Sequence, residues 1–158
     1  MPAADPSRLV VITQNASQIS FNFPFSYQDF LDFRRFAEGG GPEVPEMAKA
    51  FSGIMAYMQT PIHLSRAGES TERTYVDMVS GNYFTVLGAQ PIMGRLFPPN
   101  EGRTVGADAI IVLTYDTWRS RFAANPNIVG QTVKLNGLPF TVVGVTQPKF
   151  LGAQWARL

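Results

Sequence analysis

Cysteine is absent from this sequence of 158 residues, and histidine occurs only once. The absence of cysteine excludes a thiolate zinc site, a redox pair and a disulfide framework. A single histidine, without a dense acidic loop, gives a metal enzyme little support. A chain without cysteine suits the cytoplasm as well as an oxidising compartment, so this absence does not predict a location.

Charge is also scarce. Charged residues make up 16% of the chain, against roughly 25% in an average soluble domain. The 13 Lys and Arg residues and 12 Asp and Glu residues leave a net charge of +1, and the positive residues form no stripe. Because a nucleic-acid-binding surface needs clustered positive charge, this class of partner is excluded.

Long hydrophobic runs are missing too. The longest, residues 9–12 and 109–113, are far shorter than the roughly 20 residues that cross a bilayer. Residues 1–5 have neither a basic start nor an apolar stretch, so they do not form a signal peptide. The sequence predicts no membrane span, and its abrupt ends indicate an excised fragment.

Apolar and aromatic residues are plentiful. They include 12 phenylalanines, and hydrophobic residues make up 45% of the chain. A chain of this length buries roughly two thirds of its unfolded surface. We therefore expect one domain of ordinary size or two small lobes, with most aromatic side chains inside.

The first half predicts mixed structure. Residues 8–12 are expected to form a short buried strand and residues 19–25 an extended segment. Ser26 is a suitable N-cap for a helix over residues 26–37, with Asp29 in the capping-box position. A glycine triplet at 39–41 ends this region.

Two strands should follow over residues 53–67 and 70–80, joined by a turn at 67–70. Ile62 and Leu64, opposite Tyr75 and Val79, are expected to form the inner face of this hairpin.

The second half carries clearer signals. Residues 109–114 predict a strand buried on both faces, followed by a helix with Thr114 as its N-cap and an apolar stripe of Tyr115, Trp118 and Phe122. Asn136-Gly137 predicts a two-residue type I′ hairpin. This turn pairs Leu135 with Leu138 and Val133 with Phe140, which places the apolar pairs on one face.

The segment 79–97, VSGNYFTVLGAQPIMGRLF, has three glycines at spacings that match no dinucleotide or phosphate-binding motif. We interpret it as a structural segment rather than a phosphate-binding loop. Ser80 or Asn82 should cap a helical turn that carries Tyr83, Phe84 and Leu87. Gly88 should end that turn, and Pro91 and Gly94 should shape the following loop.

No residue set predicts a catalytic, metal or cofactor site, and the position of any ligand site stays open. His63 is conceivable as a general base, but no nucleophile accompanies it, and a strand-face role is favoured. The acidic pairs are interpreted as capping or solvated residues rather than cation ligands: Asp29 and Asp32, Glu43 and Glu46, Glu69 and Glu72. Four aromatic residues could present a partner-binding edge, but packing in the core is the favoured interpretation: Phe21, Phe23, Phe25 and Tyr27. For Trp155 both interpretations stay open.

Several blocks together resemble the extracytoplasmic core domain of MacB/FtsX-type ABC transporter permeases, closest to the duplicated orphan permeases of Acidobacteria. The resemblance runs from about residue 8 to residue 152. The blocks are FSYQDFLDFRRF, FSGIMAY, VSGNYFTVLGAQPIMGRLFPPNEG, AIIVLTYDTWRSRFAANPNIVGQTVKLNGLPFTVVGV and PKFLG.

The resemblance implies an α+β fold of two small mixed lobes. Residues 8–80 would form a porter-like βαββ lobe and residues 81–148 a second, inserted α/β-hairpin lobe. Residues 149–158 would be a truncated C-terminal segment, because the family domain continues beyond this point. Strands that complete the first lobe would then lie outside this sequence.

The resemblance also implies a non-catalytic domain at the periplasmic face of the bacterial inner membrane. It would couple movement of membrane helices to a partner, adaptor or cargo. Its partners would be the rest of the permease and a separate cytoplasmic ATPase subunit, with an adaptor or a second permease copy as further candidates. The alternative is a self-sufficient extracytoplasmic domain that binds a lipid, peptide or small ligand, and a hydrolase comes third.

Overall fold

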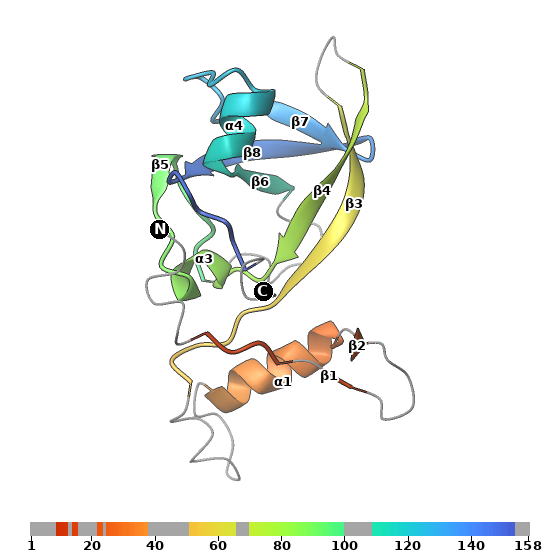
Figure 1. Ribbon diagram of the computed structural model, residues 1–158, viewed down its shortest axis with the longest axis vertical. Coiled ribbons are helices and arrows are strands. Elements are labelled where there is room, and N and C mark those ends of the chain that lie inside the picture. Colours follow the sequence, from red (N-terminus) through yellow and green to blue (C-terminus); the bar gives the residue numbers. More distant parts are fainter. Residues whose placement is uncertain are drawn as a thin grey trace.

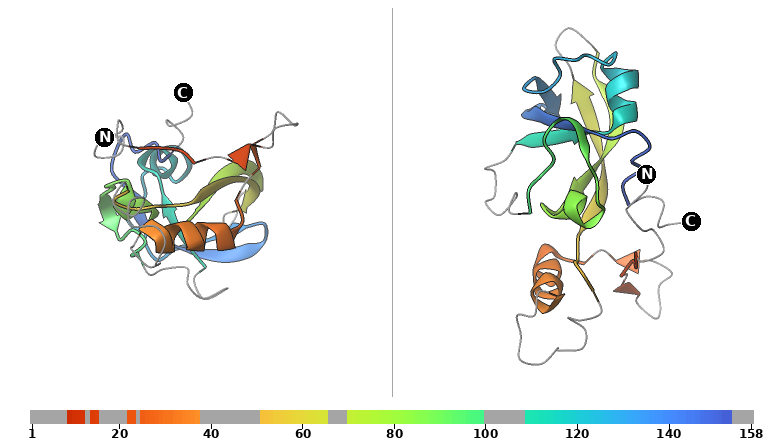
Figure 2. Two further views of the ribbon diagram at one scale, coloured as in Figure 1. Left: turned by 90° about the horizontal axis from the view of Figure 1, so that it is seen from below. Right: turned by 90° about the vertical axis from the view of Figure 1, so that its left-hand side faces the viewer.

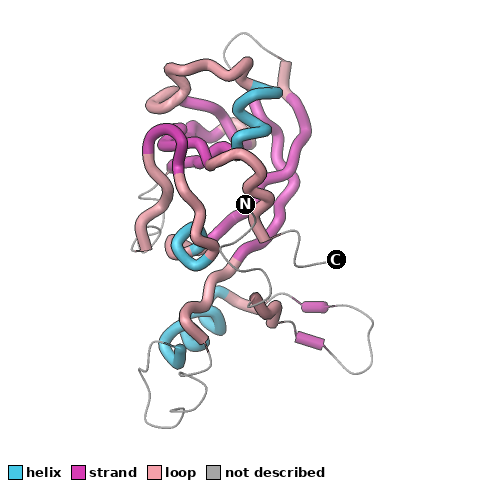
Figure 3. Tube along the Cα trace, turned by 60° about the vertical axis from the view of Figure 1, so that its left-hand side comes forward, coloured by secondary structure: helices cyan, strands magenta, loops and turns pink. Residues whose placement is uncertain are grey.

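A computed structural model describes residues 9–12, 14–15, 22–23, 25–37, 51–65, 70–99 and 109–153. A helix, α1 (Tyr27–Ala37), lies at one end of the molecule with two short paired strands, β1 (Gln14–Asn15) and β2 (Asn22–Phe23) (Figure 1). A six-stranded sheet and two further helices form the other end. The segment 51–56 leads from the region of α1 into the sheet (Figure 3).

Helix α1 begins where the sequence predicted, because Ser26 and Asp29 form a reciprocal cap. The Ser26 hydroxyl accepts the N–H of Asp29 at 3.1 Å, and the Asp29 carboxylate accepts the N–H of Ser26 at 2.8 Å. These bonds satisfy backbone groups that have no partner within the helix. Phe30 is buried, and the Phe33 ring meets that of Phe25 edge-on at 5.1 Å.

Residues 9–12 do not form the predicted buried strand. They have no strand assignment, and Val10, Val11 and Ile12 are 70%, 45% and 42% exposed. An apolar run becomes a stable strand only when it pairs with others, and residues 9–12 have no strand partner within the described part of the chain. Only Leu9 packs against a hydrophobic cluster.

The main sheet is mixed. Its order is β4-β3-β7-β8-β5, and β6 pairs with β8 in parallel. The predicted α+β class is therefore confirmed. The sheet contains strands from both sides of residue 80, and the division into lobes at 8–80 and 81–148 stays a prediction. The strands are β3 (Tyr57–Ser65), β4 (Glu72–Val79), β5 (Pro91–Gly94), β6 (Ile110–Leu113), β7 (Thr132–Leu135) and β8 (Leu138–Thr146).

The β3–β4 hairpin was predicted correctly, but its inner face was not. Ile62 and Leu64 are buried, whereas Tyr75 pairs with Pro61 and is 60% exposed. The hairpin changes its buried face along its length. Val76 packs on the cluster of Ile62 and Leu64, while Val79, three residues further on and therefore on the other face, packs on a second cluster. Simple alternation cannot reveal such a change.

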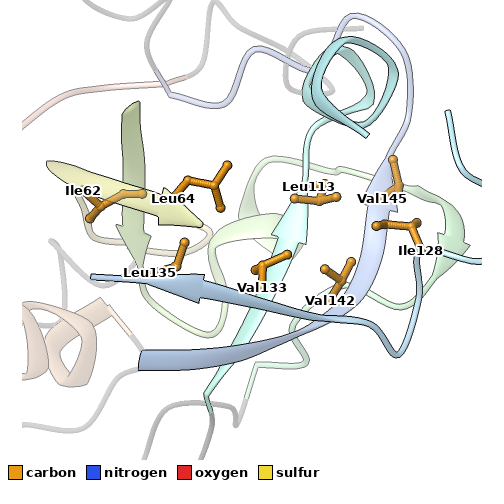
Figure 4. Packing of buried hydrophobic residues seen from close by; sticks show 8 residues of the cluster. All are labelled: Ile62, Leu64, Leu113, Ile128, Val133, Leu135, Val142 and Val145. Carbon is orange, nitrogen blue, oxygen red and sulfur yellow. The ribbon is translucent and has the colours of Figure 1, made fainter. Parts of the chain in front are cut away.

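The first hydrophobic cluster lies between the sheet and helix α4 (Tyr115–Arg121) (Figure 4). The Thr114 hydroxyl accepts the N–H of Thr117 at 3.2 Å, which confirms the predicted N-cap. The Trp118 indole N–H donates to the carbonyl of Asn125 at 2.9 Å and closes the turn after the helix. The buried members of this cluster are Ile62, Leu64, Leu113, Ile128, Val133, Leu135, Val142 and Val145.

The turn at Asn136-Gly137 has the predicted geometry and register. Both residues have positive φ, 50° and 81°, and Leu135 pairs with Leu138 as expected. Asn136 also ties this turn to β3, because it donates its N–H to the carbonyl of His63 and accepts the N–H of His63 on Oδ1. Leu138 differs from the prediction, since it lies at the tip of the hairpin and is 64% exposed.

Candidate coupling site

The second hydrophobic cluster surrounds α3 (Tyr83–Val86) and is called the α3 cluster here. Its buried residues are Tyr83, Phe84, Leu87, Ala89, Phe150 and Ala153. Helix α3 lies at the base of the β3–β4 hairpin, at the end of the sheet nearest to α1 (Figure 2). This is the place where segments far apart in the sequence meet.

The segment 79–97 builds this cluster, which confirms its architectural role. Gly88, with φ of 65°, ends the helical turn that carries Tyr83, Phe84 and Leu87. The predicted side-chain cap is wrong, because neither Ser80 nor Asn82 caps α3 with its side chain. The backbone carbonyl of Ser80 accepts the N–H of Tyr83 instead, at 2.9 Å. Both side chains turn away from α3 to the segment 54–56.

Two glycines allow β5 and β8 to approach each other closely. Gly94 and Gly144 are direct partners in the antiparallel pair. A Cβ atom at Gly94 would collide with the backbone of Val143, and one at Gly144 would collide with the backbone of Arg95. Gly94 also has a φ of 62°, which disfavours any residue with a side chain. In the sequence, the sign of this close approach is that Gly144 is a glycine inside a predicted strand. Such a glycine often marks a place where another backbone comes close.

Tyr83 links the cluster to the C-terminal part of the described chain. Its hydroxyl accepts the N–H of Ala153 at 2.9 Å. Burial raises the pKa of Tyr83 to about 12, and the negative charge of Asp77 adds to this increase. The phenol therefore stays protonated at physiological pH. No local sequence pattern connects residues 83 and 153, so this contact could not be predicted.

The α3 cluster joins both ends of the described chain. Leu9 packs against it from the N-terminal side, and Phe150 and Ala153 belong to it. Tyr57 and Val79, which pair at the base of the β3–β4 hairpin, pack on the same cluster. The cluster therefore brings segments from both ends of the described chain into contact with the base of the hairpin.

The residues weighed for chemistry do not come together. His63 is exposed on β3, and its backbone pairs with Asn136. Asp29 caps α1, Asp32 is exposed, and Glu72 forms an ion pair with Arg121 at 2.8 Å. Glu43, Glu46, Glu69, Phe21 and Trp155 lie outside the described residues.

The described residues also bear on two other features, a metal site and a membrane span. Across these ranges, no three or more His, Cys, Asp or Glu side chains lie close enough to hold a metal ion. Likewise, none of the helices that the structure describes has the length and hydrophobicity to cross a membrane.

Known proteins resemble this chain in sequence. The family described as MacB-like periplasmic core domain matches residues 2–156. The macrolide export ATP-binding/permease protein MacB of Burkholderia thailandensis is 36% identical over 74 residues, which are 47% of this chain and 11% of that protein. MacB of Escherichia coli K12 is 32% identical over 71 residues, 45% of this chain and again 11% of the relative. The chain thus spans only a small part of the curated relatives that it matches.

Solved structures of related domains also resemble this chain. The periplasmic region of MacB from Actinobacillus actinomycetemcomitans superposes with a TM-score of 0.53 at 25% identity, covering 63% of this chain and 45% of that one. The extracellular domain of the noncanonic ABC-type transporter YknZ from Gram-positive bacteria shares the fold, with a TM-score of 0.59 at 16% identity over 80% and 59% of the two chains. The chain therefore belongs to the family of MacB-like periplasmic core domains, the periplasmic part of MacB-like ABC transporter permeases.

Proposed function

We propose that this domain is a non-catalytic coupling module of an ABC transporter permease. It passes movement of the membrane helices to a partner, an adaptor or cargo outside the inner membrane. The observation that carries this proposal is the α3 cluster, in which Leu9 and Ala153 pack with the base of the β3–β4 hairpin. If the segments that flank the domain are to move it, the residues next to both segments should pack in one rigid core.

The family supports the same role. The relatives that match are named as macrolide export ATP-binding/permease proteins, so the corresponding domain in those relatives is part of an ATP-binding permease. In this permease, we propose that a separate cytoplasmic ATPase subunit supplies the energy. The domain itself then needs to move and to bind, without groups that break bonds.

Hydrolysis assays on the purified chain test the non-catalytic part of this proposal. We expect no turnover of ATP or of a generic ester above the buffer rate. His63→Ala should change nothing, because the side chain of His63 is exposed and its structural bonds use only its backbone. A hydrolysis rate that disappears in His63→Ala would contradict the proposal.

A further inference from the structure

The β3–β4 hairpin has a solvent-facing side, away from the α3 cluster, that carries a cation and an exposed aromatic ring. Leu64 of β3 is buried in the first cluster, so Pro61 and His63 lie on the opposite face of the strand. Their partners on β4 are Tyr75 and Arg73, respectively. The side chains of these four residues are all exposed. We call the surface that they form the Arg73 face.

Two cations on this side of the sheet have no partner of opposite charge. Among the residues that the structure describes, neither Arg73 nor Lys134 forms an ion pair. Lys134 is exposed on β7 and pairs with Ser65 of β3. Since Ser65 lies two residues beyond His63, Lys134 is on the same side of the sheet as the Arg73 face. The positive charge on this side is therefore open to an anionic partner.

The acidic residues of β4 do not balance this charge. Glu72 lies on the other face of the strand, where its carboxylate forms an ion pair with Arg121 of α4 at 2.8 Å. Asp77 shares a side of β4 with Arg73, but it lies toward the base of the hairpin, where its negative charge acts on Tyr83. Both carboxylates thus belong to other interactions, and neither is a cross-strand neighbour of Arg73.

The outer edge of β4 has backbone groups that a peptide can bind. β4 is the end strand of the order β4-β3-β7-β8-β5, and within the described ranges β3 is its only strand partner. The N–H of Ser80 points to β3, because it donates to the carbonyl of Ala56. By the alternation of an antiparallel pair, the N–H groups of Arg73 and Tyr75 point to the outer edge. Proline, which often blocks such an edge, is absent from β4.

We propose that the Arg73 face and the edge of β4 dock an extended acidic segment of a protein partner. The segment adds a strand to β4, and every second side chain then lies beside Arg73 and Tyr75. A carboxylate at that position pairs with the guanidinium of Arg73, and Lys134 adds attraction at longer range. A polypeptide is the fitting class of partner, because it satisfies the backbone groups of the edge, which a lipid headgroup does not.

This docking goes beyond the proposed function, because it names what the face binds and holds whether or not the domain transmits movement. Tyrosine and arginine are the residue types that most often dominate the binding energy of protein interfaces. Tyr75, at 60% exposure, has most of its ring available for such a contact.

Nuclear magnetic resonance titration of the 158-residue chain tests the docking. The probe is a short peptide of alternating threonine and glutamate, and a peptide of alternating threonine and lysine is its control. We expect the acidic peptide to shift the amide resonances of Arg73 and Tyr75 and to slow their hydrogen exchange, with Val142 in the first cluster unchanged. The lysine peptide should have no effect. Shifts without slower exchange at β4 would overturn the strand addition.

Charge reversal separates this face from net charge. Arg73→Glu should weaken binding of the acidic peptide roughly tenfold and should permit binding of the lysine peptide. Tyr75→Ala should also weaken binding roughly tenfold. Arg119→Glu is the matched control, since it makes the same change of charge at an exposed position of α4, on the other side of the sheet, and should leave the affinity unchanged. Circular dichroism reports whether each variant is folded.

Three results would overturn the inference. The first is an equal loss of affinity in Arg73→Glu and Arg119→Glu, because net charge alone would then attract the peptide. The second is no binding of the acidic peptide by the parent chain. The third is binding of the parent chain to phosphatidylglycerol vesicles in place of the peptide. None of these measurements involves the ATPase, so such a result would leave the coupling role to its own test.

Discussion

The hydroxyl of Tyr83 accepts the N–H of Ala153 at 2.9 Å, across 70 positions of sequence. Both residues are buried, with 2% exposure each. This bond joins α3, the centre of the second cluster, to the last described part of the chain. It is therefore the natural place to test whether the α3 cluster holds the domain together.

Tyr83→Phe should destabilise the domain by about 1–3 kcal/mol, because it leaves the buried N–H of Ala153 without an acceptor. Urea unfolding measures the change, and faster amide exchange at Ala153 should accompany it. Tyr75→Phe is the control, since Tyr75 is 60% exposed. Equal stability of the two variants would contradict the structural role of the Tyr83 hydroxyl.

The close approach of β5 and β8 predicts a graded response to alanine. Gly94→Ala combines a collision with Val143 and a positive φ, so it should cost roughly 3 kcal/mol or more. Gly130 also has a positive φ, 88°, but its Cβ would meet nothing within 4 Å. Gly130→Ala should therefore cost only about 1 kcal/mol. Thermal unfolding measures both, and a reversed order would refute the close-packing interpretation.

Asn136 has two separable roles in the turn between β7 and β8. Its backbone has a φ of 50°, and its Oδ1 accepts the N–H of His63 at 2.8 Å. Asn136→Gly keeps the favourable backbone and loses only the side-chain bond, so we expect a loss of about 1 kcal/mol. Asn136→Ala loses both and should cost about 1 kcal/mol more. Chemical denaturation of the two variants separates the roles, and identical midpoints would show that the φ requirement is negligible.

The cap of α1 predicts a dependence on acid pH. The hydrogen bonds from the hydroxyl and the N–H of Ser26 lower the pKa of Asp29 below 3.8. A lowered pKa stabilises the folded state above the unfolded pKa, and this contribution is lost as the pH falls through the folded value. Amide protection at the start of α1 should therefore decrease below about pH 4.

Ser26→Ala should raise the pKa of Asp29 toward its ordinary value, as measured by carboxyl NMR titration. Ser52→Ala, at an exposed serine outside α1, is the control and should leave this titration unchanged. An unaltered Asp29 titration in Ser26→Ala would show that the hydroxyl does not stabilise the carboxylate.

Local signals were the most reliable part of the sequence. The caps at Ser26 and Thr114 and the turn at Asn136-Gly137 depend on chemistry within four residues, and the structure confirms all three. Such signals need no knowledge of the rest of the fold. The family resemblance added what they lack, namely the class of protein.

Features that depend on distant partners were missed. The twisted β3–β4 hairpin exposes Tyr75 although the alternation placed it inside. Ser80 or Asn82 was expected to cap α3 with its side chain, yet the backbone carbonyl of Ser80 accepts the N–H of Tyr83, and the Ser80 hydroxyl accepts the N–H of Ala56. In both cases, the outcome was decided by where another segment lies, and a single sequence does not contain that information.

The most direct measurement of coupling uses the complete permease with its ATPase subunit in lipid bilayers. Amide hydrogen exchange in the α3 cluster, with Leu87 and Ala153 as reporters, would be compared without nucleotide and with the ATPase trapped in its nucleotide-bound state. A domain whose core receives movement from the membrane helices should show different protection of these amides in the two states. Identical protection, in a complex shown to hydrolyse ATP, would contradict the coupling role.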